Sequence, residues 1–165
     1  MISFLDLFAA LNSNGVQYLV AGGWAVNLYG VERATGDLDL IVYLEEHNLN
    51  RFIEVIQEFG FKPKAPVAVQ DFARAEKRRE WRDEKGMMVF SFYDPQNTFV
   101  LLDVFIDTPF DFESVYADRL CIPAGKIEIP VVPLETLIMM KQQAGRPQDL
   151  ADIHYLRQMQ EDAHE

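Results

Sequence analysis

Two aspartates separated by one residue, Asp37 and Asp39, have the clearest chemical potential in this chain. They lie in an apolar run, and alternate side chains of a β-strand share a face. The two carboxylates would therefore project together while Leu38 and Leu40 point into the core. Carboxylates held side by side raise each other's pKa, and a divalent cation between them relieves the repulsion. Oxygen-only ligands of this kind suit Mg²⁺ or Mn²⁺ better than zinc, so the pair indicates a divalent-metal site.

A glycine pair, Gly22 and Gly23, lies upstream of the aspartates and would form the other half of a site. It follows an apolar run and precedes a short apolar segment, as expected where a strand turns into a helix. Glycine lacks the Cβ that would keep a phosphate away, and backbone N–H groups at a helix N-terminus can face an anion. A phosphate cradle beside metal-binding carboxylates is what handling a nucleoside triphosphate requires.

Taken together, Gly22-Gly23, a short helix and Asp37-Leu38-Asp39-Leu40 resemble the signature of the nucleotidyltransferase superfamily, which has the polymerase-beta-like fold. The segment Arg33-Ala34-Thr35-Gly36 is similar to the start of the Arg-x-Thr-x-Asp-x-Asp form. That form occurs in antibiotic nucleotidyltransferases and in AbiEii-type proteins of toxin–antitoxin and phage-defence systems. The resemblance implies an α+β fold, with a mixed β-sheet, helices packed on it and a C-terminal helical pair.

The resemblance also implies a third metal carboxylate, on a strand beside the first two. We assign this role to Asp103, because apolar residues flank it on both sides and a lone Asp in a central apolar strand needs a partner. Asp107 has the same strand parity and is the rival. The resemblance further places Lys141 and Arg146 over the nucleotide phosphates.

Each candidate phosphate-binding residue has a second interpretation. Arg33 is either a phosphate or substrate contact or a charge on a surface loop, and Thr35 is either a nucleotide contact or a plain loop residue. Lys141 could instead complement a helix C-terminus, worth at most about 1 kcal/mol at an exposed site. Asp149 and Asp152 fall in the first turn of the last expected helix, where acidic residues are common. The resemblance could give one of them a salt-bridge role, and we interpret both as structural.

Length predicts one domain over residues 1–165. The resemblance implies a nucleotidyltransferase-like core over about 1–110 and a helical extension over about 111–165. The net charge of −11 argues against a broad nucleic-acid-binding surface but allows a local site for a nucleotide or a nucleic-acid end. The single cysteine, Cys121, excludes an internal disulfide. No apolar run approaches the roughly 20 residues of a membrane span, and the first residues lack a signal peptide's basic region. We therefore expect a cytoplasmic protein.

Hydrophobic periodicity predicts the elements that position these residues. Expected helices cover 4–13, 22–28, 48–59, 111–120, 134–143 and a last segment from 147, with strands over 16–20, 37–43, 87–93, 98–106, 121–123 and 126–129. The apolar stripe that the last helix would bury is formed by Leu150, Ile153, Leu156 and Met159. Residues 61–86 are expected to be the least regular, and their charged run to form a solvated face or a mobile flap over an acceptor.

These patterns leave three functional hypotheses. The first is an enzyme that transfers a nucleoside monophosphate from a triphosphate such as ATP to an acceptor hydroxyl, with Mg²⁺ or Mn²⁺ as cofactor. The acceptor would be a small molecule such as an aminoglycoside or lincosamide, a tRNA end or a partner protein. The second is a toxin or antitoxin that acts mainly by binding its partner, and the third is an inactive relative, which the three carboxylates disfavour. Because resistance enzymes of this superfamily are usually longer, the length favours the defence-system type.

Overall fold

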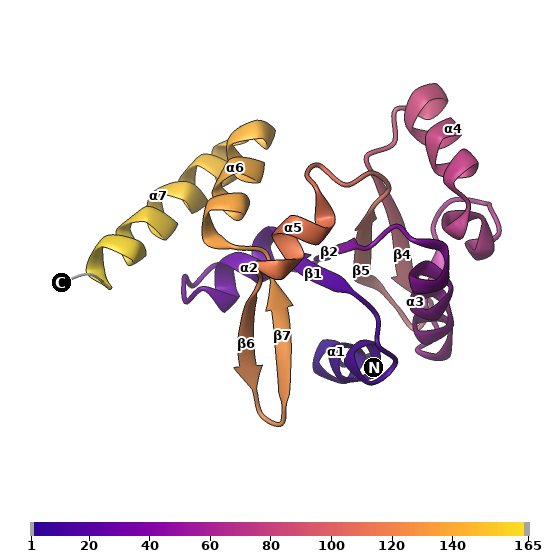
Figure 1. Ribbon diagram of the computed structural model, residues 1–165, viewed down its shortest axis with the longest axis horizontal. Helices are drawn as coiled ribbons and strands as arrows, with labels where there is room; N and C mark the ends of the chain where they lie inside the picture. The colour runs from indigo at the N-terminus through magenta and orange to yellow at the C-terminus, as the bar shows by residue number, and fades with distance from the viewer. Residues whose placement is uncertain (1, 164–165) are drawn as a thin grey trace.

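A seven-stranded mixed sheet with helices packed on it forms the framework of the computed structural model, which describes residues 2–163 (Figure 1). The helices are α1 (Phe4–Ser13), α2 (Gly22–Leu28), α3 (Glu46–Glu58), α4 (Ala75–Lys85), α5 (Phe112–Ala117), α6 (Leu134–Ala144) and α7 (Pro147–Asp162), with a 3₁₀ turn η1 (Val69–Ala73). The strands are β1 (Tyr18–Ala21), β2 (Leu38–Val42), β3 (Lys62–Pro63), β4 (Val89–Asp94), β5 (Asn97–Phe105), β6 (Leu120–Ala124) and β7 (Ile127–Val131). This arrangement confirms the predicted α+β class.

The order of the strands brings the two acidic segments together. The sheet runs β3-β4-β5-β2-β1-β7-β6, with β2 antiparallel to β1 and parallel to β5. In this parallel pairing Asp39 and Asp103 are register partners. Register partners project from the same face of a sheet, so the two carboxylates lie side by side. Leu38 and Leu40 point the other way and are fully buried.

A hydrogen-bonded asparagine at the start of α3 ties β1 to β2 at the end away from the candidate site. The carboxylate of Glu45 accepts from the backbone N–H groups of His47 and Asn48 and so caps this helix. The buried side chain of Asn48 then bonds both backbone groups of Gln17 and the carbonyl of Tyr43. These bonds tie the start of β1 to the end of β2, so the opposite ends of both strands, which carry the site, are held in register.

The C-terminal helices α6 and α7 pack against each other, and α6 contacts α2. In Figure 1 they lie at the end of the molecule opposite α4. The predicted apolar stripe of α7 was wrong at Leu150, which is 56% exposed, whereas Leu156 is buried as expected. The buried side of α7 instead carries Asp149 and Asp152, so this helix docks partly through charged groups.

The charged segment before β4 is more regular than its sequence predicted. It forms α4, in which Arg78 and Trp81 are buried while most of the other side chains are exposed. The guanidinium of Arg78 donates to the carbonyl oxygen of Phe72 at 2.6 Å, and Trp81 stacks on Phe90. The helix therefore has a solvated face, as one of the two predictions held, and also a buried side that the sequence did not predict. The expected helix over 111–120 is also shorter, because α5 ends at Ala117 and Leu120 begins β6.

Two further observations bear on the expectations from composition. Cys121 is an exposed free thiol. Among the helices of residues 2–163, none combines the length and the apolar content that crossing a membrane requires.

Candidate functional site

The three candidate carboxylates meet at one end of the β2–β5 pair. Asp37 lies one residue before β2, and Asp39 lies within it beside its register partner Asp103 on β5. The third strand, β4, contributes Ser91, whose hydroxyl donates to Oδ1 of Asp103 at 2.6 Å. Asp107, the rival of Asp103, instead forms an ion pair with Arg82 of α4 at 2.8 Å. Of the two rivals, the structure brings only Asp103 beside Asp39.

Burial and nearby negative charge raise the pKa values of two of these carboxylates, Asp37 and Asp39. Burial is the largest cause of the raised pKa of Asp39, which reaches about 7, and the charges of Asp103 and Asp37 add to it, while Lys141 and Arg146 oppose it. Burial and the charge of Asp103 also raise the pKa of Asp37. Uncompensated negative charge is therefore concentrated here, which is what a bound cation would relieve.

The glycine pair at the start of α2 lies directly against the aspartate strand. Gly22 has a φ of +63°, a backbone conformation that favours glycine. A Cβ on Gly22 would overlap the carboxylate of Asp39 and would lie 2.8 Å from its Cγ. A Cβ on Gly23 would lie 2.5 Å from Oγ1 of Thr35. A side chain at either position would displace Asp39 or Thr35, so the two glycines let the backbone of α2 lie close to the acidic group.

Substitution of Gly22 by alanine should disturb both the fold and the acidic group. The positive φ and the overlap with Asp39 together predict a loss of about 2 kcal/mol of unfolding free energy. Chemical denaturation measures this value. Gly86→Ala is the matched control, because Gly86 has a φ of +62° but a Cβ added there would meet no atom within 4 Å, so it reports backbone strain alone. Equal losses in the two variants would contradict a steric role for Gly22.

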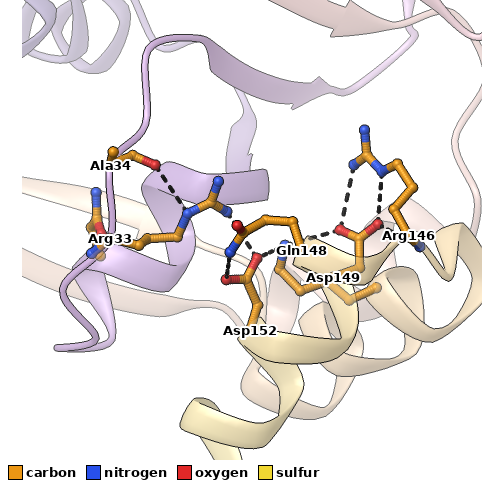
Figure 2. Close-up of polar contacts among 8 residues, drawn as sticks. Arg33, Ala34, Arg146, Gln148, Asp149 and Asp152 are labelled. Atoms are coloured by element: carbon orange, nitrogen blue, oxygen red, sulfur yellow. Dashed lines mark hydrogen bonds and ion pairs between the residues drawn. The ribbon is translucent and has the colours of Figure 1, made fainter.

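Three candidate cations gather on the other side of the glycine pair, and all of them are already paired with acids. Figure 2 shows Arg33, on the loop before β2, reaching toward Asp152 of α7, while Arg146 turns to Asp149. The distances are 2.8 Å from Arg33 Nη1 to Asp152 Oδ2 and 2.8 Å from Arg146 Nε to Asp149 Oδ2. The buried ammonium of Lys141 lies 2.8 Å from Asp152 and 3.5 Å from Asp149. These five residues are called the ion cluster below.

The ion cluster explains how two aspartates can be buried on α7. Burial alone would raise the pKa of Asp149, but hydrogen bonds from the side chain and backbone of Arg146 and the charge of Lys141 outweigh it and lower that pKa. Asp152 receives bonds from Arg33, Lys141 and the amide of Gln148. The interpretation of both aspartates as helix-terminal charges was therefore incomplete, because they hold the three cations in place. Sequence reasoning also passed over Ser91 and Gln148.

A cavity of about 600 Å³ joins the glycine pair, the aspartates and the ion cluster. Its lining contains eight of the nine predicted site residues, namely Gly22, Gly23, Arg33, Thr35, Asp37, Asp39, Lys141 and Arg146. The ninth, Asp103, lines a second cavity of about 470 Å³, which shares Asp37, Asp39 and Arg146 with the first. The carboxylates therefore form the wall between a cationic cavity and a second one.

Within residues 2–163, no three His, Cys, Asp or Glu side chains are already arranged to hold a metal ion. The arrangement can nonetheless do three things chemically. Its cations can attract phosphate, its glycines allow close backbone approach, and its carboxylates can accept a proton or ligate a cation.

Comparison with solved structures connects this fold to known proteins. A lincosamide antibiotic adenylyltransferase, LnuA, solved with lincomycin bound, superimposes with a TM-score of 0.61 at 17% identity, over 94% of this chain and 93% of that one. An antigenic nucleotidyltransferase-like protein from Paracoccidioides brasiliensis gives 0.59 at 18% identity, over 93% of this chain and 72% of that one. ANT(2″)-Ia, solved with adenylyl-2″-tobramycin, superimposes with a TM-score of 0.56 at 14% identity, over 93% of this chain and 84% of that one. At these identities the likeness shows the fold, which is the nucleotidyltransferase fold predicted from the sequence.

The comparison with LnuA corrects the argument from length. Because this chain covers 93% of LnuA, an antibiotic adenylyltransferase can be about as short as this protein. Length therefore does not favour the defence-system type over the small-molecule type.

Sequence comparison identifies the family. No curated protein sequence matches the chain. A family described as nucleotidyl transferase AbiEii toxin, type IV TA system, matches residues 5–165. This match confirms the resemblance seen in the Gly-Gly and Asp-x-Asp segments. The chain is a nucleotidyltransferase that belongs to the AbiEii toxin family.

Proposed function

We propose that this nucleotidyltransferase uses a divalent metal ion to transfer a nucleoside monophosphate from a nucleoside triphosphate to an acceptor hydroxyl. The observation that carries the proposal is the register pairing of Asp39 with Asp103 directly beside Gly22. It places carboxylates next to a point where the backbone can approach a triphosphate. The three cations of the ion cluster line the same cavity and supply positive charge for the phosphates.

In the proposed reaction, the acceptor hydroxyl gives its proton to the carboxylate of Asp103. Its oxygen then forms a bond to the α-phosphorus, and the bond from that phosphorus to the oxygen bridging to the β-phosphate breaks. The electron pair leaves with pyrophosphate. Gly22, Gly23 and Thr35 would position the triphosphate, while Arg33, Lys141 and Arg146 would offset the charge that develops on it.

The residues present fit a magnesium or manganese ion in their chemistry. Asp37, Asp39 and Asp103 offer only oxygen ligands, and the raised pKa of Asp39 reflects burial and crowded negative charge. These three residues would hold the metal. When bound, Mg²⁺ or Mn²⁺ would supply charge stabilisation to both the attacking and the leaving oxygens.

The second cavity is the natural place for the acceptor, because Asp103 lines it. Its other walls include the apolar side chains of Met88, Phe105, Pro109 and Met140. Apolar walls next to carboxylates suit a small cationic molecule better than a nucleic-acid end, and the net charge of −11 points the same way. Small antibiotics such as lincosamides and aminoglycosides are therefore the first acceptors to test, ahead of a tRNA end or a partner protein.

Calorimetric titration of nucleoside triphosphates in Mg²⁺ or Mn²⁺ tests the proposal, followed by transfer of labelled nucleotide to an acceptor panel. Wild type should bind nucleotide only with metal, and Asp37→Ala/Asp39→Ala should lose that binding. Asp107→Asn is the control, because Asp107 is an acid two residues beyond β5 whose carboxylate is paired with Arg82. The absence of metal-dependent nucleotide binding by folded wild type would overturn the proposal.

A second candidate function is partner binding within a toxin–antitoxin pair, which the description of the family favours. Three large apolar side chains on α6 and α7 are exposed, namely Met139, Leu150 and Tyr155. An exposed apolar patch on these helices would support partner binding. Co-purification with the product of a neighbouring gene, lost on Leu150→Glu, would support this function; copurification unaffected by Leu150→Glu would count against these helices as the interface.

A further inference from the structure

We propose that Ser91 is a positioning residue, which holds the carboxylate of Asp103 in one rotamer and leaves its second oxygen facing the acceptor. This inference rests on the proposed function, because it takes Asp103 as the group that receives the acceptor's proton. It adds a residue on a third strand to the site.

The geometry of the hydrogen bond supports this role. Ser91 and Asp103 are register partners on the antiparallel strands β4 and β5, and the hydroxyl of Ser91 donates to Oδ1 of Asp103 at 2.6 Å. A carboxylate can only accept, so the hydroxyl must donate, and a donor to an anion makes a short and strong bond. Within residues 2–163, no hydrogen bond or ion pair reaches Oδ2 of Asp103. The bond therefore selects which oxygen stays available.

Ser91 is itself held firmly. Its carbonyl oxygen accepts from the backbone N–H of Lys64 at 2.9 Å, so β4 is bonded on both sides at this position. Its neighbours Phe90 and Phe92 are buried on the opposite face of the strand. A serine is an unusual choice for the interior of a sheet strand, where β-branched and aromatic residues are favoured. Its hydroxyl has a clear partner in Asp103, and that contact accounts for the choice.

The position of the bond also suits catalysis. Asp103 lines the cavity assigned to the acceptor, and Asp39 is its register partner on the other side. A carboxylate free to rotate would point its oxygens toward the acceptor only part of the time. A displacement of about 1 Å in a reacting group can reduce a rate by about 100-fold, so loosening one carboxylate should reduce kcat by about tenfold.

The first test measures the rotamer of Asp103 in the metal-free protein. Three-bond scalar couplings across its χ1 angle should report one rotamer in wild type and in Ser91→Thr, which keeps the hydroxyl. Ser91→Ala should give averaged couplings. Tyr93→Phe is the matched control, because it removes a hydroxyl from the same face of β4 and should leave the couplings of wild type. A single Asp103 rotamer in Ser91→Ala would overturn the inference.

The second test measures steady-state kinetics with an acceptor that wild type uses. Ser91→Ala should lower kcat about tenfold while the KM for the nucleoside triphosphate changes by less than about twofold. Ser91→Thr should restore most of kcat. An unchanged kcat in Ser91→Ala would also overturn the inference. If wild type modifies no acceptor, the proposed function fails, and the couplings still decide whether Ser91 positions Asp103.

Discussion

Asp39→Asn should greatly reduce nucleotidyl transfer and, at pH 8 without metal, make the protein more stable than wild type. The two effects have one cause, because the carboxylate proposed to hold the metal is held at a cost to the fold. Loss of a proposed metal ligand should lower kcat/KM by about 1,000-fold. Asparagine has nearly the same shape but carries no charge for Asp103 and Asp37 to repel. A stabilising change that inactivates is the signature of a site under electrostatic strain.

The pH dependence of stability gives this prediction a clear sign. Burial and the neighbouring carboxylates raise the pKa of Asp39 in the folded protein to about 7, from an ordinary value of 3.8. Below pH 3.8 this group is protonated in both states and contributes no difference. Between pH 4 and 7 the unfolded chain has lost this proton while the folded chain keeps it, so stability falls as pH rises. The full pKa shift corresponds to a loss of about 4 kcal/mol of unfolding free energy above pH 7. Asp39→Asn should recover about half of this loss, since the amide is still buried.

Denaturation of both proteins at pH 4 and pH 8, each with EDTA and with Mg²⁺, measures these effects. The difference between variant and wild type should be small at pH 4 and about 2 kcal/mol at pH 8 with EDTA. Mg²⁺ should narrow the gap by stabilising wild type alone. Asp107→Asn serves as the control, because the carboxylate of Asp107 is exposed and already paired with Arg82. Equal stability of wild type and Asp39→Asn at pH 8 would contradict the strained-carboxylate interpretation.

The parts of the site that the sequence predicted well are those encoded locally. Gly22 and Asp39 lie on consecutive elements, so a strand, a short helix and a second strand are enough to bring them together. The alternation of polar and apolar residues around Asp39 predicted correctly that Leu38 and Leu40 would be buried. The choice of Asp103 over Asp107 followed from apolar residues on both sides, and the structure does place Asp103 beside β2. Its role, like those of the other site residues, stays a prediction.

The parts that the sequence did not predict depend on distant pairing. Arg33 and Asp152 form an ion pair although they are 119 positions apart in the sequence, and no local pattern connects them. The partner of Ser91 depends on an irregularity between Tyr93 and Asp94, which shifts the register of the β4–β5 hairpin. A regular hairpin continued from the Asp94–Asn97 pair would have placed Ser91 opposite Val100, on the other face from Asp103. Such a bulge depends on tertiary packing that the turn sequence does not contain.

A similar limit applies to the charged helix α4. Its sequence has very few apolar residues, so periodicity indicates no buried face and favours a solvated segment. The guanidinium of Arg78 is buried because it bonds the carbonyl oxygen of Phe72 at the end of η1. A charged side chain can therefore occupy a core position when the fold supplies its partner, and that partner is invisible in a window of α4 alone.

Lys141→Met should be among the most destabilising single changes in the C-terminal half of the chain. Lys141 is buried between Asp149 and Asp152, and methionine would fill much of its volume while leaving both carboxylates short of a cation. Breaking a buried pair from one side typically costs about 3–5 kcal/mol, because the remaining charge stays buried. Arg33 and Arg146 still bond the two carboxylates, so we expect about 3 kcal/mol by chemical denaturation.

The same two helices offer an internal comparison for this prediction. Glu135 of α6 and Arg157 of α7 also form an ion pair, at 2.6 Å, but both side chains are exposed. Because water screens an exposed pair, Glu135→Gln should leave the denaturation midpoint almost unchanged.

A second variant, Lys141→Met/Asp152→Asn, should recover part of the lost stability by removing one of the buried charges that Lys141→Met leaves uncompensated. If Lys141→Met and Glu135→Gln were equally mild, the buried ion cluster would not be what docks α7 onto the site. If the double variant lost more than Lys141→Met alone, Asp152 would contribute chiefly through Arg33 and Gln148, and the loop before β2 would be the element that it anchors.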